Sequence, residues 1–311
     1  MVVVFGSINL DLVARVPRFA QPGETLAADA FALHPGGKGA NQALAAARAG
    51  ARVALAGAVG RDAFAALALA LLRAGGVDLS AVRSVDGPTG IALIEVAASG
   101  ENRILIVAGA NAQVDASDVH AQLLGPSTVV LLQQEIPAAA NLSLAARARA
   151  AGARIVLNAA PARAVQTALL DLVDILVVNE TEMRSLAAAS DLPAEPAAFA
   201  TAFARRRGAI AVVTLGAQGA VAAEPAACHA LPAPPVAAID TTGAGDAFVG
   251  ALAAAVDRGE PLPEALAWGI AAGSLACTRE GAQPALPHAS EIAPLAATVQ
   301  MRQSPAPRRP G

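Results

Sequence analysis

Short apolar runs alternate with alanine-rich stretches along most of this chain. The apolar runs are mostly β-branched, and Gly, Asn, Pro or a charged residue bounds each of them. They lie at 2–5, 52–56, 128–132, 154–157, 175–178 and 210–214. The stretches with helix-like composition lie at 40–49, 63–74, 138–151, 180–189 and 197–207. Strands that are apolar on both faces and alternate with helices predict an α/β fold, with a doubly wound, mainly parallel sheet flanked by helices.

Two segments interrupt this alternation. Residues 10–34 hold Pro17, Pro22 and Gly23 among alternating positions, and 90–108 reads as two strands around a turn at 99–102. Four short strands without helices predict a small second β-sheet, which can act as a lid beside a ligand crevice. We expect one α/β domain over residues 1–295 that includes this lid. A Pro- and Arg-rich tail, 296–311, is expected to be disordered.

The hydropathy of the chain does not indicate a membrane protein. The mean hydropathy is +0.51, but much of the apolar composition is alanine, which is a weak hydrophobe. The longest apolar run, 63–72, is too short to span a bilayer and is interpreted as a buried helix. The first apolar run has no basic residues before it, so it predicts a strand rather than a signal peptide.

Charge and cysteine content exclude further classes of function. The formal net charge is −3, from 22 basic and 25 acidic residues, so no basic surface for nucleic acid is expected. The two cysteines, Cys228 and Cys277, are interpreted as free thiols in a reducing, cytoplasmic environment. No Cys/His spacing resembles a zinc site.

The strongest chemical signal is segment 240–248, which reads Asp-Thr-Thr-Gly-Ala-Gly-Asp-Ala-Phe. Gly243 and Gly245 directly precede a helical run, and free N–H groups at a helix start can hold an anion. Asp246 would lie at the mouth of this anion site, where a carboxylate can take a proton from an attacking hydroxyl. The alternative is that Asp246 only caps the helix and the glycines only form a turn.

Two further motifs place polar groups at the starts of helices or the ends of strands. In segment 34–43, glycines bring Lys38 and Asn41 to a helix start, where their donors suit sugar hydroxyls or a phosphate. Asn9 and Asp11 directly follow the first strand, at the edge where doubly wound sheets bind ligands. Polar or glycine-rich residues also follow later strands, at Glu135, Asn179, Glu182 and 214–219. A flexible loop, an Asx turn and an N-cap are the alternative interpretations of these motifs taken one at a time.

Together these motifs resemble the ribokinase family of sugar kinases, in the order typical of that family and over about 2–287. The segments that carry the resemblance are 6–11, 22–25, 36–43, 109–111, 132–135, 158–162, 178–182, 214–216, 240–246 and 281–283. The resemblance implies ATP-dependent phosphorylation of D-ribose at its 5-hydroxyl, with magnesium and an activating potassium ion. It also implies a cytoplasmic homodimer that associates through the lid sheets.

The resemblance assigns a role to each matching position. Asp246 would be the base, and Gly243, Ala244 and Gly245 would supply backbone N–H groups to the transferring phosphoryl. The sugar would be held by Asn9, Asp11, Gly37, Lys38, Gly39, Asn41, Glu135 and Asp246. The nucleotide and magnesium side would be lined by Asn179, Glu182, Thr214, Leu215, Gly216, Ala217, Gln218, Gly219, Gly245 and Asp246. The potassium site would be formed by Asp240, Thr242, Ala276, Arg279, Gly281 and Ala285.

The sequence departs from the family pattern in three places. Ile270 stands where many members have a polar residue near the adenine, and Ala285 stands where a hydroxyl often closes the cation site. Segment 158–161 reads Asn-Ala-Ala-Pro instead of the more usual Asn-Pro-Ala-Pro. Three alternative functions remain. The first is a kinase of the same fold that acts on 2-deoxyribose, another sugar or a nucleoside. The second is a non-catalytic sugar-binding regulator, and the third is a nicotinamide-dependent dehydrogenase. The absent dinucleotide fingerprint disfavours the last of these.

Overall fold

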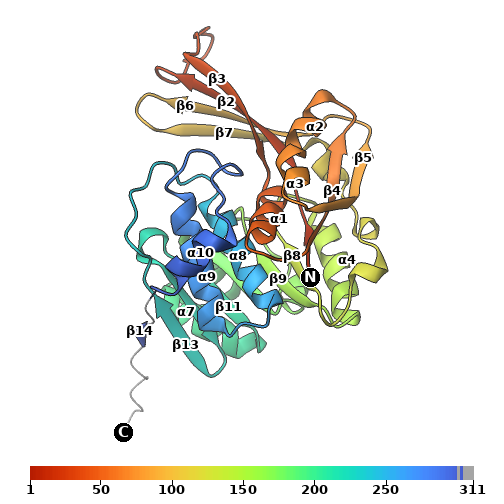
Figure 1. The fold of residues 1–311 in the computed structure, drawn as a ribbon, viewed down its shortest axis with the longest axis vertical. Coiled ribbons are helices and arrows are strands. Elements are labelled where there is room, and N and C mark those ends of the chain that lie inside the picture. The colour runs from red at the N-terminus through yellow and green to blue at the C-terminus, as the bar shows by residue number, and fades with distance from the viewer. Residues whose placement is uncertain (300–301, 304–311) are drawn as a thin grey trace.

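The computed structural model of the chain describes residues 1–299 and 302–303. A large sheet forms the centre, and a smaller sheet projects from it at the top of Figure 1. The order of the large sheet is β14-β13-β12-β11-β10-β9-β8-β1-β4-β5. Its strands are β1 Val2–Phe5, β4 Val53–Gly60, β5 Asp78–Val85, β8 Val129–Leu132, β9 Arg154–Asn158, β10 Ile175–Asn179, β11 Ile210–Thr214, β12 Ala220–Glu224, β13 Ala227–Leu231 and β14 Arg302–Gln303.

The large sheet is parallel from β11 to β5, and β12 to β14 add antiparallel pairs at one edge. The parallel strands are those expected from the apolar runs, together with β5, whose mixed pattern gave no strand signal. In β1, Val2 and Val4 pack into the core on one face, whereas Val3 and Phe5 pack into the core on the other. This double burial is the reason that the run is apolar at every position.

Helices cover both faces of the large sheet. One core contains residues of α1, α3, α8, α9 and α10, and the other contains residues of α4, α5, α6 and α7. Short 3₁₀ turns occur at Gly109–Gln113, Ala116–Asp118, Ala121–Leu123 and Gly216–Gln218. The helices are α1 Lys38–Arg48, α2 Ala63–Ala68, α3 Ala70–Ala74, α4 Ala138–Ala150, α5 Thr167–Leu170, α6 Glu180–Ser190, α7 Pro196–Arg207, α8 Ala244–Asp257, α9 Leu262–Ala276 and α10 Ala289–Ala296.

The apolar run 63–72 differs from the expected buried helix. It forms two short helices, α2 and α3, and only Ala68, Leu69 and Leu72 of this run are buried. Leu67 is 45% exposed. Because alanine dominates the run, its apolar composition does not require burial of every face. None of the helices in the described ranges is long and apolar enough to cross a membrane.

The second sheet is the expected lid. Its order is β3-β2-β6-β7, with β2 Asn9–Val16, β3 Ala30–Gly36, β6 Gly90–Ala97 and β7 Asn102–Val107. Strand β2 begins only four residues after β1, because residues 6–8 turn the chain from one sheet into the other. The lid therefore starts at the carboxyl edge of the large sheet, and its first strand carries Asn9 and Asp11.

The end of the chain is partly described. Ala296 is the last residue of α10 and is buried, and Arg302–Gln303 pairs with β13. Residues 300–301 and 304–311 of the expected disordered tail lie outside the described residues.

Candidate active site

The sheet topology brings the predicted site residues to one edge. Strand β1 lies between β8 and β4, so the chain order reverses beside β1. A ligand crevice forms at such a reversal, beyond the carboxyl ends of the strands. Asn9 follows β1, Glu135 follows β8, and Asn179 ends β10. The starts of α1 and α8 lie at the same edge, and they bring Lys38 and Asp246 to it.

Asp246 lies in the first turn of α8 and is only 7% exposed. Both of its carboxylate oxygens accept hydrogen bonds from α1. Asn41 Nδ2 donates to Oδ2 at 2.9 Å, and Gln42 Nε2 donates to Oδ1 at 2.8 Å. Each oxygen keeps lone-pair capacity for a further donor, since an ionised carboxylate accepts about four hydrogen bonds. The arrangement holds a carboxylate in one orientation at the start of a helix.

The turn before α8 presents backbone donors. Gly243 has a φ of 76°, and a Cβ there would lie 2.9 Å from the backbone of Ala282, so this position requires glycine. The N–H of Ala244 donates to the Thr241 carbonyl at 3.2 Å. In the described part of the chain, the N–H groups of Gly243, Gly245 and Asp246 meet no acceptor. Of the three N–H groups predicted to hold a phosphoryl, the one of Ala244 is therefore already engaged.

Glu135 and Asn9 are held by neighbours from distant segments. The Ser7 hydroxyl and the Lys38 backbone N–H donate to Glu135 Oε2 at 2.5 Å and 3.0 Å. Asn111 Nδ2 donates to Asn9 Oδ1 at 2.7 Å, which leaves the Asn9 amide nitrogen for another acceptor. These contacts fix the orientation of both side chains before any ligand binds.

The glycines of segment 36–39 have different tasks. A Cβ on Gly36 would lie 2.3 Å from the Asp11 carboxylate, so this glycine makes room for Asp11. Gly37 has a φ of 88° and ends the turn into α1. A Cβ on Gly39 would lie 2.6 Å from the backbone of Gly6 and Ser7. Gly39, which was assigned to sugar binding, therefore lets α1 pack closely on the end of β1.

The charges of the site are strongly coupled. Burial, with Glu135 and Asp246 nearby, raises the pKa of Asp11 to about 7. The negative charge of Asp246, followed by that of Glu135 and Glu182, raises the pKa of Lys38 and keeps its ammonium group charged despite burial. Burial also raises the pKa of Glu182. The positive charge of Lys38 thus offsets only part of the negative charge of Asp246, Glu135 and Glu182.

Two adjoining pockets lie on the nucleotide side. One, of about 120 Å³, contains Lys38, Glu182 and Asp246 among its lining residues. The other, of about 480 Å³, is mostly apolar and is lined in part by Phe248 and Ile270. Thr214 and Gly245 line both pockets. A small polar chamber beside a larger apolar one suits the phosphates and the base of a nucleotide.

Most of the predicted nucleotide residues lie in these pockets. Asn179 and Glu182 line the smaller one, and Gly216, Ala217 and Gly219 line the larger one. Gln218 is exposed and lines neither pocket. Leu215 also lines neither, because its side chain packs against the hydrophobic core. The sequence motif could not separate the residues of this turn that face the ligand from those that support it.

The predicted cation loop is tied together by Asp240. Its Oδ1 accepts from the backbone N–H and hydroxyl of Thr242, and its Oδ2 accepts from the N–H of Gly281 at 2.8 Å. Burial would raise the pKa of Asp240, but these hydrogen bonds outweigh burial and lower it. Within the described residues, the carbonyl oxygens of Thr242, Arg279 and Gly281 accept no hydrogen bond. Unpaired carbonyls on two loops joined by Asp240 fit a monovalent cation, and the predicted member Ala285 is fully buried.

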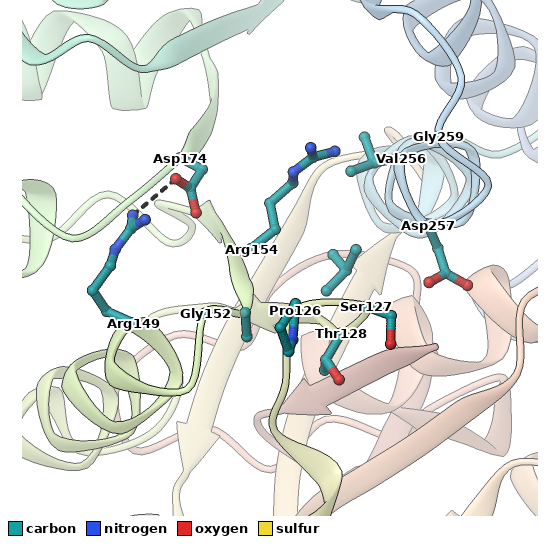
Figure 2. Close-up of a pocket in the computed structure, with 12 residues that line it drawn as sticks. Pro126, Ser127, Thr128, Arg149, Gly152, Arg154, Asp174, Val256, Asp257 and Gly259 are labelled. Carbon is teal, nitrogen blue, oxygen red and sulfur yellow. Dashed lines mark hydrogen bonds and ion pairs between the residues drawn. The ribbon is translucent and has the colours of Figure 1, made fainter.

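A separate pocket of about 300 Å³ lies at the opposite edge of the large sheet, where β8 and β9 begin and α8 ends. Figure 2 shows its Arg149–Asp174 ion pair, with the nitrogen and oxygen 2.8 Å apart. Arg154 and Asp257 also line it. It contains none of the predicted site residues, so it is not the candidate active site.

Ser7, Gln42 and Asn111 belong to the site although no role was predicted for them. All three lie within motifs that sequence analysis singled out. Their function depends on hydrogen bonds to residues about 100 to 200 positions away, such as the bond from Gln42 to Asp246. A motif shows that a segment matters, but it does not identify the partner of each side chain.

Comparison with known proteins defines the family. The model of the pfkB family of carbohydrate kinases matches residues 1–289. This chain belongs to the pfkB family. Membership in this family agrees with the predicted fold and with a phosphotransferase site at the carboxyl edge of the sheet.

Individual pfkB family members named ribokinase match over nearly the full length. Ribokinase of Haemophilus influenzae is 37% identical over 293 residues, which are 93% of this chain and 95% of that protein. The crystal structure of ribokinase from Thermotoga maritima superposes with a TM-score of 0.88 at 33% identity, covering 96% and 99% of the two chains. Ribokinase of Arabidopsis thaliana, solved with ribose and ATP, gives a TM-score of 0.86 at 33% identity, covering 95% and 98%.

Proposed function

We propose that this pfkB kinase transfers the γ-phosphoryl group of ATP to the 5-hydroxyl of D-ribose, giving ribose 5-phosphate and ADP. The observation that carries the proposal is the buried Asp246 carboxylate, held by Asn41 and Gln42 at the start of α8. It lies between the sugar-side residues on the lid and the polar chamber of the nucleotide side. Similarity to ribokinases, including one solved with ribose and ATP, supports ribose as the acceptor.

The sugar binds between the lid and the core. Asn9 and Asp11 come from β2 of the lid, whereas Lys38, Asn41 and Glu135 come from the core. Carboxylates accept hydrogen bonds from ring hydroxyls, and amides both accept and donate them, so a sugar that lacks one hydroxyl leaves a buried polar group unpaired. Because both layers contact the sugar, binding also draws the lid over the site and excludes water from the phosphoryl group.

Asp246 then acts as general base. Its carboxylate takes the proton of the 5-hydroxyl as the hydroxyl oxygen bonds to the γ-phosphorus, and the bond from that phosphorus to the bridging oxygen of ADP breaks. The N–H groups of Gly245 and Asp246 and the dipole of α8 stabilise the charge that develops on the phosphoryl oxygens. Lys38, which interacts with Asp246 and Glu182, adds a positive charge in the same chamber.

Metal ions would support these groups. Asn179 and Glu182, which line the smaller pocket, would hold magnesium, and this ion would supply positive charge to the phosphates of ATP. Asp240, Thr242, Ala276, Arg279, Gly281 and Ala285 are the residues that would surround potassium. This ion would fix the loop that carries the N–H donors. Within the described ranges, no group of three or more His, Cys, Asp and Glu side chains is arranged to hold a metal ion by itself.

The deciding experiment is an ADP-release assay with ATP, magnesium and potassium, comparing D-ribose, 2-deoxyribose, fructose and adenosine. The proposal expects turnover with ribose to exceed turnover with each of the others. Preference for another acceptor would keep the mechanism but replace the substrate. Sugar binding without any turnover would instead support a non-catalytic regulator.

The residue at 285 sets the strength of potassium activation. Ala285→Ser places a hydroxyl at the predicted cation site and is expected to lower the potassium concentration for half-maximal activity about fivefold, the effect of one added polar contact. Potassium should also raise the Tm of the variant more than that of the unaltered protein, because a ligand stabilises the state that binds it. Titration with KCl, at constant ionic strength in tetramethylammonium chloride, measures both. Equal potassium responses would contradict the predicted site.

The lid provides the surface for the proposed homodimer. Cross-strand pairing places Leu33, Leu12, Leu93 and Leu105 in one row across the lid, and Leu105 is 63% exposed. This row lies on the face opposite Asp11, since alternate residues of a strand point to opposite faces. An apolar row of this kind on a projecting sheet is typical of a protein interface.

Leu105→Glu is expected to convert the dimer to a monomer, because it places a charge in the apolar interface. Sedimentation equilibrium measures the mass. Ile104→Glu is the matched control, since it changes the neighbouring residue on the other face and should leave the mass unchanged. A monomer before any substitution would refute the dimer.

The free thiols of Cys228 and Cys277 agree with the cytoplasmic location that we propose.

A further inference from the structure

A chain of buried amide side chains leads from the end of β8 to Asp246. Gln133 Nε2 donates to Gln42 Oε1 at 2.8 Å. Gln42 Nε2 in turn donates to Asp246 Oδ1 at 2.8 Å and to Asn158 Oδ1 at 2.9 Å. Gln42 and Gln133 have no exposed surface. A substrate therefore has no access to either side chain, and both act on the site only through their neighbours.

The carboxylate of Asp246 determines which amide atom donates and which accepts along this series of hydrogen bonds. Ionised Asp246 only accepts, so Gln42 must present its nitrogen to Asp246 and its oxygen to Gln133. Gln133 must then donate, and its own oxygen lies buried against Gly6 without a partner among the described residues. Asn158 accepts from Gln42 and donates to the Val177 carbonyl at 3.2 Å. An unpaired buried oxygen, such as that of Gln133, is unfavourable. The structure nevertheless keeps the hydrogen bond from Gln42 to Asp246 and leaves the Gln133 oxygen without a partner in the described part of the chain.

Close helix packing brings Gln42 to this position. Helix α1 crosses α8 where Gly250 replaces a side chain one turn after Asp246. A Cβ on Gly250 would lie 2.5 Å from the Ala45 side chain and 2.7 Å from the Gln42 carbonyl oxygen. The backbones therefore approach to a distance that no larger residue allows, and the Gln42 amide reaches the carboxylate directly.

We propose that Gln42 is the positioning residue for Asp246. It holds the carboxylate in the orientation that meets the sugar hydroxyl, and this inference rests on the proposed kinase function. Asn41 shares the task on the other oxygen but also faces the sugar side, whereas Gln42 is fully buried and, among the described residues, its side chain bonds only to Asp246, Asn158 and Gln133. Asp11, Lys38 and Glu182 also interact electrostatically with Asp246 and stay in place in every variant considered below.

Gln42→Met tests the proposal, because methionine has a similar size and no donor. Loss of a hydrogen bond to a charged group is expected to lower kcat about 10- to 100-fold. The KM for the sugar should change less than twofold, since Gln42 does not contact it. The matched control is Gln134→Met, which removes a neighbouring buried amide whose bonds go to the carbonyls of Ala159 and Pro161. We expect it to lower Tm while kcat stays within about twofold, as is typical of a structural hydrogen bond.

A double mutant separates positioning from general damage. If Gln42 acts through Asp246, adding Gln42→Met to Asp246→Asn lowers kcat by no more than about twofold further, because the two residues form one unit. A second loss of 10- to 100-fold in that background would overturn the proposal. So would a kcat of Gln42→Met equal to that of Gln134→Met.

The tests distinguish this inference from the proposed function. The ratio of variant to parent rates is measured with whichever sugar of the panel is phosphorylated best, so it is independent of ribose specificity. Crystal structures of the parent and Gln42→Met give a readout without turnover. The Asp246 carboxylate plane should keep one orientation in the parent and turn, or occupy two orientations, in the variant. An unchanged carboxylate in the variant would contradict the positioning role even if ribose is the substrate.

Discussion

Asp246→Asn lowers kcat for sugar phosphorylation by roughly two to four orders of magnitude, the usual contribution of a general base. The amide that replaces the carboxylate has nearly the same shape, but it cannot take the proton of the attacking hydroxyl. Sugar affinity should be largely retained, because the other sugar-side groups on β2, α1 and after β8 are unchanged. Steady-state kinetics with the best sugar of the panel, together with calorimetry for sugar binding, measures the two effects separately.

Asp257→Asn is the matched control for this prediction. Asp257 ends the same helix, far from the site, and accepts from the N-terminal ammonium group of Met1 at 2.5 Å. Its loss should lower Tm, because the ion pair with Met1 is largely buried, and should leave kcat within about twofold of the parent. Near-normal turnover of Asp246→Asn would refute the base assignment.

Asp11→Asn is expected to weaken sugar binding strongly and to stabilise the free protein. The ionised carboxylate is the stronger acceptor for sugar hydroxyls, so its loss should raise the KM for the sugar about 10- to 100-fold. For the parent, the KM should also rise as pH falls below about 7, where Asp11 takes up a proton. Measuring the KM of the parent and of Asp11→Asn between about pH 5.5 and 8.5, a range that extends on both sides of the raised pKa, tests both statements.

The stability effect has a defined sign. The pKa of Asp11 is raised from 3.8 to about 7, so between these values the folded protein binds a proton that the unfolded chain does not. The free energy of unfolding therefore falls as pH rises toward and through about 7. Asp11→Asn removes this dependence and should be more stable than the parent by roughly 1–3 kcal/mol at pH 8. Urea unfolding at several pH values measures the difference.

Asp29→Asn is the control for Asp11, since it removes an exposed carboxylate from the same region of the lid. It should change neither KM nor the pH dependence of stability. If Asp11→Asn proved as pH-dependent as the parent, the raised pKa could not be the cause. An unchanged sugar affinity in Asp11→Asn would remove Asp11 from the sugar site.

The sequence by itself determined the layered fold and the edge that carries the site. A strand such as β1 is apolar at every position because both of its faces are buried, and this pattern is local and readable. Glycines before a helix start are equally local, so the anion site that we propose at 243–246 could be predicted from a few residues. The run 63–72 was misread because alanine is compatible with both buried and exposed faces.

The tertiary structure alone decided which side chains meet. Asn41 and Gln42 contact Asp246 across 205 and 204 positions of sequence, and Gly39 lets α1 pack closely on Gly6 and Ser7. Leu215 packs against the core although its neighbours line the larger pocket. Such contacts depend on how closely two helices approach and on which direction each side chain takes. Both are set by packing between distant segments, which no local pattern of residues records.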